Sequence, residues 1–371
     1  MQDHLLTLNA GSSSIKAALF ALGSALNVPA RSTQIERIGQ AGAPAASHDQ
    51  ALRQILSAWR DARIVAVGHR VVHGGTAFDA PVLIDDGVLA NIAALNGLAP
   101  LHQPHNLAGI VAARAAFAGV PQVACFDTSF HRSMPEVSQR FALPQAQHDA
   151  GVRRYGFHGL SYESIRDQLQ TLEPELARQR VVVAHLGNGA SMCAMRGGQS
   201  IATTMSFSPL DGLPMGTRCG RLDAAVVLHL QRSQGMAIDA IEHLLYRESG
   251  LLGLSGLASD MRTLQASDSP AAHRAVDYFV EHVLRELAGM AAALRGIDAV
   301  VFTGGIGENA IELRRRIVEG AAWLGLSIDE AANGLGERCI SSGTSAVQVR
   351  VMRTNEEAVI AGHAARVAKG G

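Results

Sequence analysis

The residues near the N-terminus with the clearest chemical potential form a small polar turn between two apolar runs. The turn contains Asn9, Gly11, Ser12, Ser14 and Lys16. Lys16 is one of two lysines among the 32 basic residues, the other 30 being arginines. A lysine ammonium is a compact charge that can lie against a phosphate, whereas arginine presents a wide planar fork. The turn therefore predicts a phosphate-binding loop, although a lysine placed at a strand edge by chance fits the composition equally well.

Two further glycine-rich turns could bind anions through their backbone N–H groups. One is Gly187–Ser191, and the other is Gly304–Ala310, which follows an apolar run and precedes the amphipathic segment 311–324. A turn that leads from a strand into a helix suits a nucleotide phosphate. The second turn also matches the dinucleotide fingerprint G-x-G-x-x-A, but only 42 residues (371 minus 329) follow the matching acidic residue Asp329, too few for a dinucleotide domain. A Walker P-loop is excluded because the chain has no Gly-Lys dipeptide.

Three segments place arginine and histidine beside glycine: 68–75 with Arg70, 153–159 with His158, and 215–221 with Arg218. Cations on a tightly turned backbone can approach a small anion, so these segments predict an anionic substrate next to the phosphate loops. His102 and His131 fit a catalytic and a structural role equally well. Asp127 ends an apolar strand, and Glu356 follows another, where each could be a metal ligand or a helix cap.

Strands and helices alternate around these loops, which predicts an α/β protein. The runs 5–8 and 15–22 form a predicted hairpin around the first turn, and 181–186 and 190–195 repeat that plan about 180 residues later. The repetition favours two related halves over two unrelated hairpins. Further strands are predicted at 64–67, 120–126, 299–303 and 347–352, and a long amphipathic helix at 270–294.

Length and composition limit the class of protein. A chain of 371 residues usually forms two domains, and a net charge of −1 provides no general field for nucleic acid or membrane. The four cysteines are far apart and form no CxxC pair, which argues against a zinc site and against a disulfide framework. We expect a cytoplasmic protein with no membrane partner and no nucleic-acid partner, because the sequence has neither a signal-peptide pattern nor a long apolar run.

These segments together resemble the acetate kinase family, within the superfamily of sugar kinases, actin and the heat-shock chaperone ATPase. The resemblance runs nearly end to end and rests on LNAGSSSIK, GHRVVHGG, PLHQPHN, FDTSFH, RYGFHG, HLGNGAS, SPLDGLPMGTR, SGLASD, FTGGIGEN and TNEE, in the family's order. It implies two duplicated actin-like, ribonuclease H-like ATPase domains around a central cleft. We place the N-terminal domain at 1–145 and the nucleotide-binding domain at 146–356, with a last helix at 357–371 that packs back on the N-terminal domain.

The resemblance also implies a role for individual residues. Catalytic roles fall on Asp127, His158 and Arg218. The carboxylate substrate would contact Arg70, with its acyl group against Val72, Leu101, Phe157 and Pro209. ATP contacts are implied at Ser12, Ser14, Lys16, His185, Leu186, Gly187, Asn188, Gly189, Asp260, Met261, Arg262, Gly305, Ile306, Gly307, Glu308 and Asn309. Asn9 and Glu356 match the positions for Mg²⁺, for which Mn²⁺ is a possible substitute, and the family implies a homodimer.

The implied reaction is transfer of the ATP γ-phosphoryl group to acetate, with propionate or butyrate kinase activity, or a weakly active ATP-binding homologue, as alternatives. A sugar kinase would need hydroxyl-binding Asn and Asp where this chain has arginines. The chain departs from the family pattern at Ala202, Ser206 and Arg221, the last replacing an acidic residue close to Arg218. These departures leave the acyl pocket, the dimer contact and the rate open.

Overall fold

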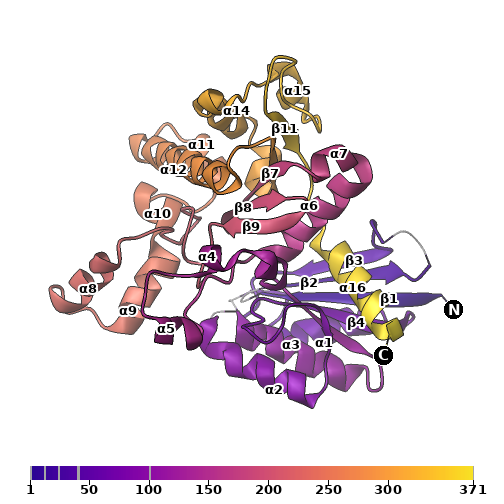
Figure 1. The fold of residues 1–371 in the computed structure, drawn as a ribbon. Helices are drawn as coiled ribbons and strands as arrows, with labels where there is room; N and C mark the ends of the chain where they lie inside the picture. The colour runs from indigo at the N-terminus through magenta and orange to yellow at the C-terminus, as the bar shows by residue number, and fades with distance from the viewer. Residues whose placement is uncertain (1, 12–13, 24–25, 40–41, 100–101, 371) are drawn as a thin grey trace. The chain divides into compact units, whose positions relative to one another are not determined.

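The computed structural model describes residues 2–11, 14–23, 26–39, 42–99 and 102–370, and Figure 1 shows its fold. The chain divides into two compact units. The first comprises Met1–Arg132, Phe157–Ser164 and Asn355–Gly371, and the second comprises Ser133–Gly156 and Ile165–Thr354. The first crossing of the chain thus lies at 132/133, earlier than the expected boundary at 145/146, and residues 157–164 return to the first unit.

The first unit is built on a six-stranded mixed sheet. Its strands are β1 (Asp3–Ala10), β2 (Ile15–Ala21), β3 (Arg31–Ile35), β4 (Arg63–Val71), β5 (Val82–Leu83) and β6 (Gln122–Phe126), in the spatial order β3-β2-β1-β4-β6-β5. The hairpin of β1 and β2, which the sequence predicts, is antiparallel, and its register places Asn9 opposite Lys16. β4 lies parallel to β1, and β6 lies parallel to β4.

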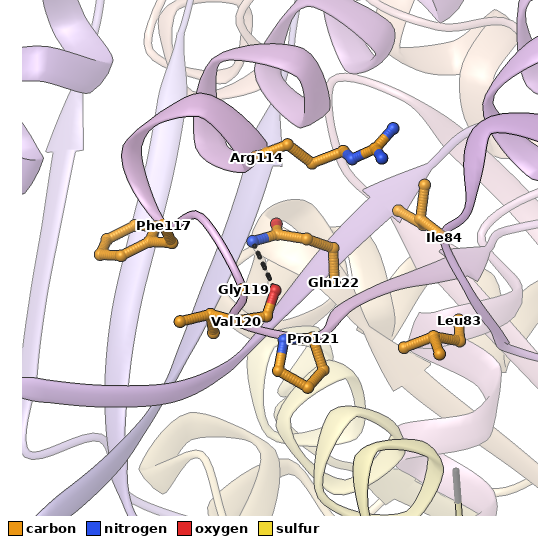
Figure 2. A pocket seen from close by; sticks show the side chains of 8 residues that line it. All are labelled: Leu83, Ile84, Arg114, Phe117, Gly119, Val120, Pro121 and Gln122. Carbon is orange, nitrogen blue, oxygen red and sulfur yellow. Dashed lines mark hydrogen bonds between the residues drawn. The ribbon is translucent and has the colours of Figure 1, made fainter.

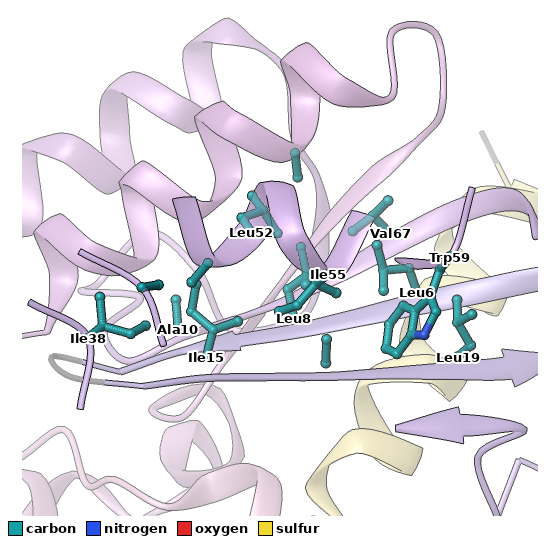
Figure 3. Close-up of a cluster of buried hydrophobic side chains, with 14 residues drawn as sticks. Leu6, Leu8, Ala10, Ile15, Leu19, Ile38, Leu52, Ile55, Trp59 and Val67 are labelled. Carbon is teal, nitrogen blue, oxygen red and sulfur yellow. The ribbon is translucent and has the colours of Figure 1, made fainter. Parts of the chain in front are cut away.

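Alternate residues of β1 point to opposite faces of this sheet, and each face is covered by helices. Leu6 and Leu8 belong to a core cluster with α1 (His48–Ala58) and α3 (Gln103–Ala116), which Figure 3 shows. Leu5 belongs to the cluster on the other face, which includes side chains of α16 (Glu356–Gly370). The last helix therefore packs on β1 and β4 of the first unit.

The second unit repeats this strand arrangement in a five-stranded sheet. Its strands are β7 (Arg180–Leu186), β8 (Ala190–Arg196), β9 (Gln199–Thr203), β10 (Ala299–Thr303) and β11 (Gln348–Val351), in the spatial order β11-β10-β7-β8-β9. β7 pairs antiparallel with β8, and β8 with β9, whereas β10 lies parallel to both β7 and β11. The order of two antiparallel pairs followed by parallel strands matches that of β3-β2-β1-β4-β6, and the first unit adds the antiparallel edge strand β5. The predicted α/β fold with two sheets of like topology is confirmed.

The long helix α12 (Pro270–Leu294) has the predicted bounds and packs against β8. Proline at its first position and a left-handed Arg295 at its end suit a helix start and stop. The segment predicted as one helix at 311–324 divides into α14 (Ile311–Gly320) and the 3-10 helix η4 (Ala322–Leu324). The glycine turn before it is itself a short helix, α13 (Gly304–Asn309).

The remaining helices complete the two units. They are α2 (Asp86–Ala94), α4 (Glu136–Gln139), α5 (Gln145–Asp149), α6 (Gly159–Leu172), α7 (Pro174–Ala177), α8 (Ala224–Arg232), α9 (Ile238–His243), α10 (Gly250–Ser255), α11 (Met261–Gln265), α15 (Glu330–Leu335), η1 (Leu95–Leu98), η2 (Ser129–Ser133) and η3 (Leu244–Glu248). Among the described residues, every helix is too short or too polar to span a bilayer.

Candidate active site

The first unit gathers Arg70, Asp127, Asn9 and Glu356 into one cluster. The Arg70 guanidinium donates to both Asp127 carboxylate oxygens, with the Nη2–Oδ2 distance at 2.6 Å, and Nη1 donates to Asn9 Oδ1 at 3.2 Å. Glu356 Oε2 lies 3.9 Å from Arg70 Nε. The Asp127 side chain is 2% exposed and that of Arg70 is 21% exposed, so this is a largely buried ion pair.

The strand arrangement explains why these residues meet. Asn9 lies near the end of β1, Arg70 near the end of β4, and Asp127 directly after β6. These strands are parallel, so their carboxyl ends share one edge of the sheet, where functional groups of α/β proteins gather. Burial lowers the pKa of the Arg70 guanidinium, but Asp127 and Glu356 outweigh burial and hold this pKa above its ordinary value. Arg70 therefore remains a permanent cation at this edge.

Glu356 reaches the cluster because α16 packs closely on β4. A Cβ atom at Gly68 would lie 2.5 Å from Cγ2 of Ile360, so glycine permits this approach two residues before Arg70. Asn355 caps the helix by accepting from the Ala358 N–H, and its own N–H donates to Ser164 Oγ at 2.9 Å. The first turn of α16, with Glu356, is thereby fixed beside the sheet.

His158 is held in a left-handed backbone conformation with φ at 59°, which costs a residue other than glycine about 1–2 kcal/mol. The neighbouring Gly159 donates to the Asp127 carbonyl at 2.9 Å, and a Cβ atom there would lie 2.1 Å from that oxygen. On the other side, buried His131 Nε2 lies 2.9 Å from the Phe157 carbonyl. Strained backbone of this kind is typical of functional sites, and here it places His158 at the start of α6 beside Asp127.

Burial lowers the pKa of His131 to about 4, so the ring is neutral near neutral pH and donates its Nε2 proton to the Phe157 carbonyl. Of the two roles that the sequence leaves open, His131 therefore has the structural one. His102 precedes α3 at its N-cap position, and nothing assigns it a catalytic role.

The buried side chains Val72 (5% exposed) and Phe157 (1% exposed) belong to the same unit as Arg70. Two polar residues of α3, which sequence reasoning left without a role, fix the strand end that carries Val72. Asn106 accepts from the Val72 N–H at 3.0 Å and donates to the Ala10 carbonyl at 2.6 Å. Gln103 bonds both backbone groups of His73. Both residues lie in the PLHQPHN marker, and their burial is the signal that distinguishes them from surface residues.

The second unit brings together the other predicted loops. The turn after β7, with Gly187–Gly189, lies against α13, because a Cβ atom at Gly304 (φ 79°) would lie 2.7 Å from the Leu186 carbonyl. The Asn188 carbonyl accepts from the Gly216 N–H at 3.2 Å, which joins this turn to the segment before Arg218. Arg218 Nη1 in turn donates to the Pro209 carbonyl at 3.1 Å. His185–Gly189, Gly305–Asn309, Pro209 and Arg218 thus form one continuous region.

Side chains predicted to contact ATP also stabilise these loops. Glu308 accepts from the Gly304 N–H at 3.0 Å, and Asn309 donates to the Gly305 carbonyl at 2.8 Å. Asp260 caps α11, the helix with Met261 and Arg262, and its bonds from Thr263 lower its pKa. Buried Arg314, which sequence reasoning missed, donates to the Gly307 and Glu308 carbonyls at 3.0 and 2.8 Å and so holds the end of α13.

The departures from the family pattern have local partners in the second unit. Arg221 pairs with Glu286 of α12 at 3.0 Å, where the Glu286 side chain is 6% exposed. Ser206 donates to Asp211 at 2.6 Å, and Arg154 lies 3.6 Å from the same carboxylate. Ala202 is a strand residue of β9. Arg221 therefore neutralises the buried Glu286 carboxylate. Its ion-pair partner lies on α12 and is not part of the segment around Arg218.

Of the predicted site residues, Ser12 and Leu101 lie outside the described part of the chain. Lys16 and Ser14 lie in the first unit, and Lys16 is exposed opposite Asn9. The first unit therefore holds the predicted metal and carboxylate positions, whereas the second holds Arg218, Pro209 and the remaining ATP positions.

The chain is similar to known proteins over nearly its whole length. Residues 4–362 match the Acetokinase family. The acetate kinase of Methylocella silvestris is 52% identical over 396 residues, covering 98% of this chain and 97% of that protein. That of Rhodopseudomonas palustris is 50% identical over 398 residues and covers 100% of both chains.

Solved structures show the same similarity. A propionate kinase from Francisella tularensis is 35% identical with a TM-score of 0.93, covering 98% of this chain and 100% of that one. The acetate kinase of Porphyromonas gingivalis is 34% identical with a TM-score of 0.89, covering 98% of this chain and 99% of that one. The family predicted from the sequence is confirmed, and this chain belongs to the acetokinase family.

Proposed function

We propose that this protein transfers the γ-phosphoryl group of ATP to acetate, giving acetyl phosphate and ADP, in a reversible reaction. Family membership supports the reaction type. The observation that carries the proposal is the Arg70 cluster, in which a permanent cation lies at the sheet edge, two residues before buried Val72 and in the unit that also holds buried Phe157. Arg70 would bind the acetate carboxylate, and the apolar side chains would contact its methyl group.

The chemistry requires charge neutralisation more than a strong base. Acetate is ionised at neutral pH, so its oxygen can attack the γ-phosphorus while the bond to the β–γ bridging oxygen breaks and ADP leaves with the electron pair. An anion must approach a polyanion in this step. Arg70 would orient the carboxylate, and His158 and Arg218 would donate to the equatorial phosphoryl oxygens as their charge develops. Asp127, bonded to Arg70 through both carboxylate oxygens, would hold that guanidinium in position.

The residues at the sheet edge fit a divalent metal. Asn9 Oδ1 and the Glu356 carboxylate are hard oxygen donors around the same guanidinium, Asp127 adds another carboxylate, and no cluster of three His, Cys, Asp or Glu occurs among the described residues. Mg²⁺ prefers this sparse set, because it keeps several waters and binds through one or two carboxylates plus substrate phosphates. Bound there, Mg²⁺ (or Mn²⁺) would neutralise charge on the ATP phosphates.

ATP would bind to the second unit. The turn Gly187–Gly189 and the start of α13 supply backbone N–H groups for phosphates, and Asp260–Arg262 lies at the start of α11. From the first unit, Lys16 would contact the ATP phosphates as a point charge, together with Ser12 and Ser14.

The protein would act as a homodimer. Helix α8, with the sequence AAVVLHLQR, has no buried residue, and Val226 and Leu228 remain 37% and 47% exposed. A helix of this composition requires an apolar partner, and a second copy of the chain is the partner that we propose. The variant Leu228→Glu should halve the mass measured by light scattering, and an unchanged mass would refute this interface.

The four cysteines are free thiols, which supports a reducing, cytoplasmic compartment.

The function is tested by initial rates of ADP formation with formate, acetate, propionate and butyrate. Val72 and Phe157 are almost completely buried, so the acyl-pocket wall that we propose they form would not easily recede from a longer chain. We expect the highest kcat/KM with acetate, lower but measurable activity with propionate, and little with butyrate. Strong preference for butyrate would overturn the assignment, and absence of turnover with every carboxylate would favour a non-catalytic ATP-binding homologue.

A further inference from the structure

A cavity of about 350 Å³ lies in the first unit, at the start of β6 and beside the end of α3. Its apolar lining includes Leu83, Phe117, Val120 and Pro121, and its polar side chains are Arg114 and Gln122 (Figure 2). None of these residues belongs to the proposed active site, because β6 begins in the cavity and Asp127 follows the opposite end of the strand. The cavity therefore offers binding capacity that phosphoryl transfer does not use.

Gln122 presents a fixed amide to the cavity. The residue is 4% exposed, and its Oε1 is held 2.7 Å from Nε2 of buried His69. This bond orients the amide so that Nε2 faces the other way, where it donates to the Val120 carbonyl at 3.4 Å, drawn in Figure 2. That distance is long for an N–H···O bond, so the amide nitrogen retains donor capacity for a ligand.

Arg114 supplies a cation, and an anionic ligand could displace its present partner Asp86 with little loss of free energy. Its Nη2 donates to Asp86 Oδ1 at 2.9 Å, but the Asp86 side chain is 93% exposed whereas that of Arg114 is 32% exposed. An ion pair with such an exposed partner contributes little, about 0.2–1 kcal/mol. A ligand carboxylate next to the apolar lining would meet the same guanidinium in a less hydrated setting.

We propose that this cavity binds a small monocarboxylate with an apolar ring or branched chain. Its carboxylate would accept from Arg114 and from Gln122 Nε2, and its apolar part would pack on Leu83, Phe117 and Pro121. A single cation matches a single negative charge, so a di- or triphosphate is a poor fit. The volume lies at the lower end for ligand sites, about 300–1,000 Å³, and therefore suits a benzoate-sized molecule rather than a nucleotide.

Asp86 makes the proposal testable by a gain of affinity. We would titrate the full-length protein with para-fluorobenzoate by fluorine NMR, using wild type, Asp86→Asn and Arg114→Gln, with neutral para-fluorobenzamide as control ligand. Asp86→Asn removes the competing carboxylate and should tighten binding about threefold, whereas Arg114→Gln should weaken it about tenfold. The benzamide should bind at least tenfold more weakly than the benzoate to wild type.

Equal dissociation constants for the three proteins would overturn the proposal, and would instead indicate binding at another cationic site such as Arg70. Equal affinity for benzoate and benzamide would also contradict it. A folding defect cannot produce the increase expected for Asp86→Asn, so this variant keeps the test decisive even if Arg114→Gln proves unstable. The titration measures binding alone, and its result is independent of phosphoryl transfer.

Discussion

At the scale of single residues, we propose that Lys16 and Arg218 have different tasks, ATP binding and stabilisation of the transition state respectively. Lys16 is exposed on β2 opposite Asn9, whereas Arg218 donates to the Pro209 carbonyl within the second unit. In the proposed mechanism, Lys16 contacts ATP in both the ground state and the transition state, but Arg218 meets charge that develops only in the transition state. The two residues should therefore differ in how their loss affects the kinetics.

Arg218→Ala should lower kcat by two to three orders of magnitude, about 3–4 kcal/mol, and leave the KM for ATP nearly unchanged. Lys16→Ala should mainly raise the KM for ATP. Steady-state kinetics of both variants at saturating acetate separates these effects. Near-normal kcat in the Arg218→Ala enzyme would contradict the role in transition-state stabilisation proposed for this arginine.

Arg221 provides a second test, because it pairs with the buried carboxylate of Glu286. Burial raises the pKa of Glu286, and the nearby Arg221 opposes that effect. Arg221→Asp would place a second negative charge beside a buried carboxylate. We expect a loss of about 1–3 kcal/mol in the free energy of unfolding, with the lower end reflecting the exposure of Arg221.

The matched control is the double variant Arg221→Asp with Glu286→Gln, which removes the buried charge. Urea unfolding should show that the double variant recovers most of the stability lost in the single one, a coupling that a double-mutant cycle quantifies. Additive effects of the two substitutions would show that the ion pair contributes nothing to the fold.

At the scale of elements, two helices present candidate catalytic groups at their N-terminal ends. α6 begins directly after His158, and α16 begins with Glu356. A hydrogen bond between buried side chains links them, with His363 Nε2 lying 3.0 Å from Glu163 Oε2, and exposed Arg366 extends the chain with Nη2 at 2.7 Å from His363 Nδ1. Arginine can only donate, so Nδ1 accepts and Nε2 donates to Glu163. We predict that His363 acts as a positioning residue between the two helices.

Replacing His363 by leucine should lower kcat with little change in the KM for ATP, because the link between the two helices is lost while the ATP loops of the second unit remain intact. Replacement by glutamine, whose amide can still donate to Glu163, should restore most of the activity. Steady-state kinetics of the two variants, with rates normalised to the concentration of folded protein, gives the kcat and the KM for ATP that test this prediction. Equal activity of both variants would show that the hydrogen bond is not what positions the site.

Sequence patterns predicted the elements better than the contacts between them. The bounds of β10 and α12 agree with the prediction, because a short buried run and a 3.6-residue period are local signals. The boundary at 132/133 and the return of residues 157–164 were missed, because they depend on packing between distant segments. Asn106, Gln103 and Arg314 were missed for the same reason: each forms a hydrogen bond with a residue far from it in the sequence, Arg314 with Asn333.

At the scale of the whole molecule, the first unit contains three buried histidines whose pKa burial lowers to about 4: His69, His73 and His131. In the unfolded chain each has a pKa near 6.5. Between about pH 6.5 and 4 the unfolded state therefore binds more protons than the folded state. Stability is fully present above this window and falls as the pH decreases through it.

We expect the free energy of unfolding to decrease by up to about 1.4 kcal/mol per pH unit for each of these histidines. Urea unfolding at several pH values measures this change, with Trp59 as the reporter of the first unit and exposed Trp323 replaced by phenylalanine. His69→Gln should reduce the change in unfolding free energy per pH unit by about one third, because one of the three histidines no longer titrates. A stability that stays constant from pH 6.5 to 4 would contradict the neutral, buried state of these rings.

The most direct test of the central claim is trapping of the acyl phosphate with hydroxylamine in a reaction of ATP, Mg²⁺ and acetate. The Arg70 cluster and the ATP loops predict ATP-dependent formation of acetyl hydroxamate, with loss of this product in Arg218→Ala and no phosphorylation of a sugar panel. Phosphorylation of a sugar without any hydroxamate, or ATP binding with no product from any short carboxylate, would contradict the account.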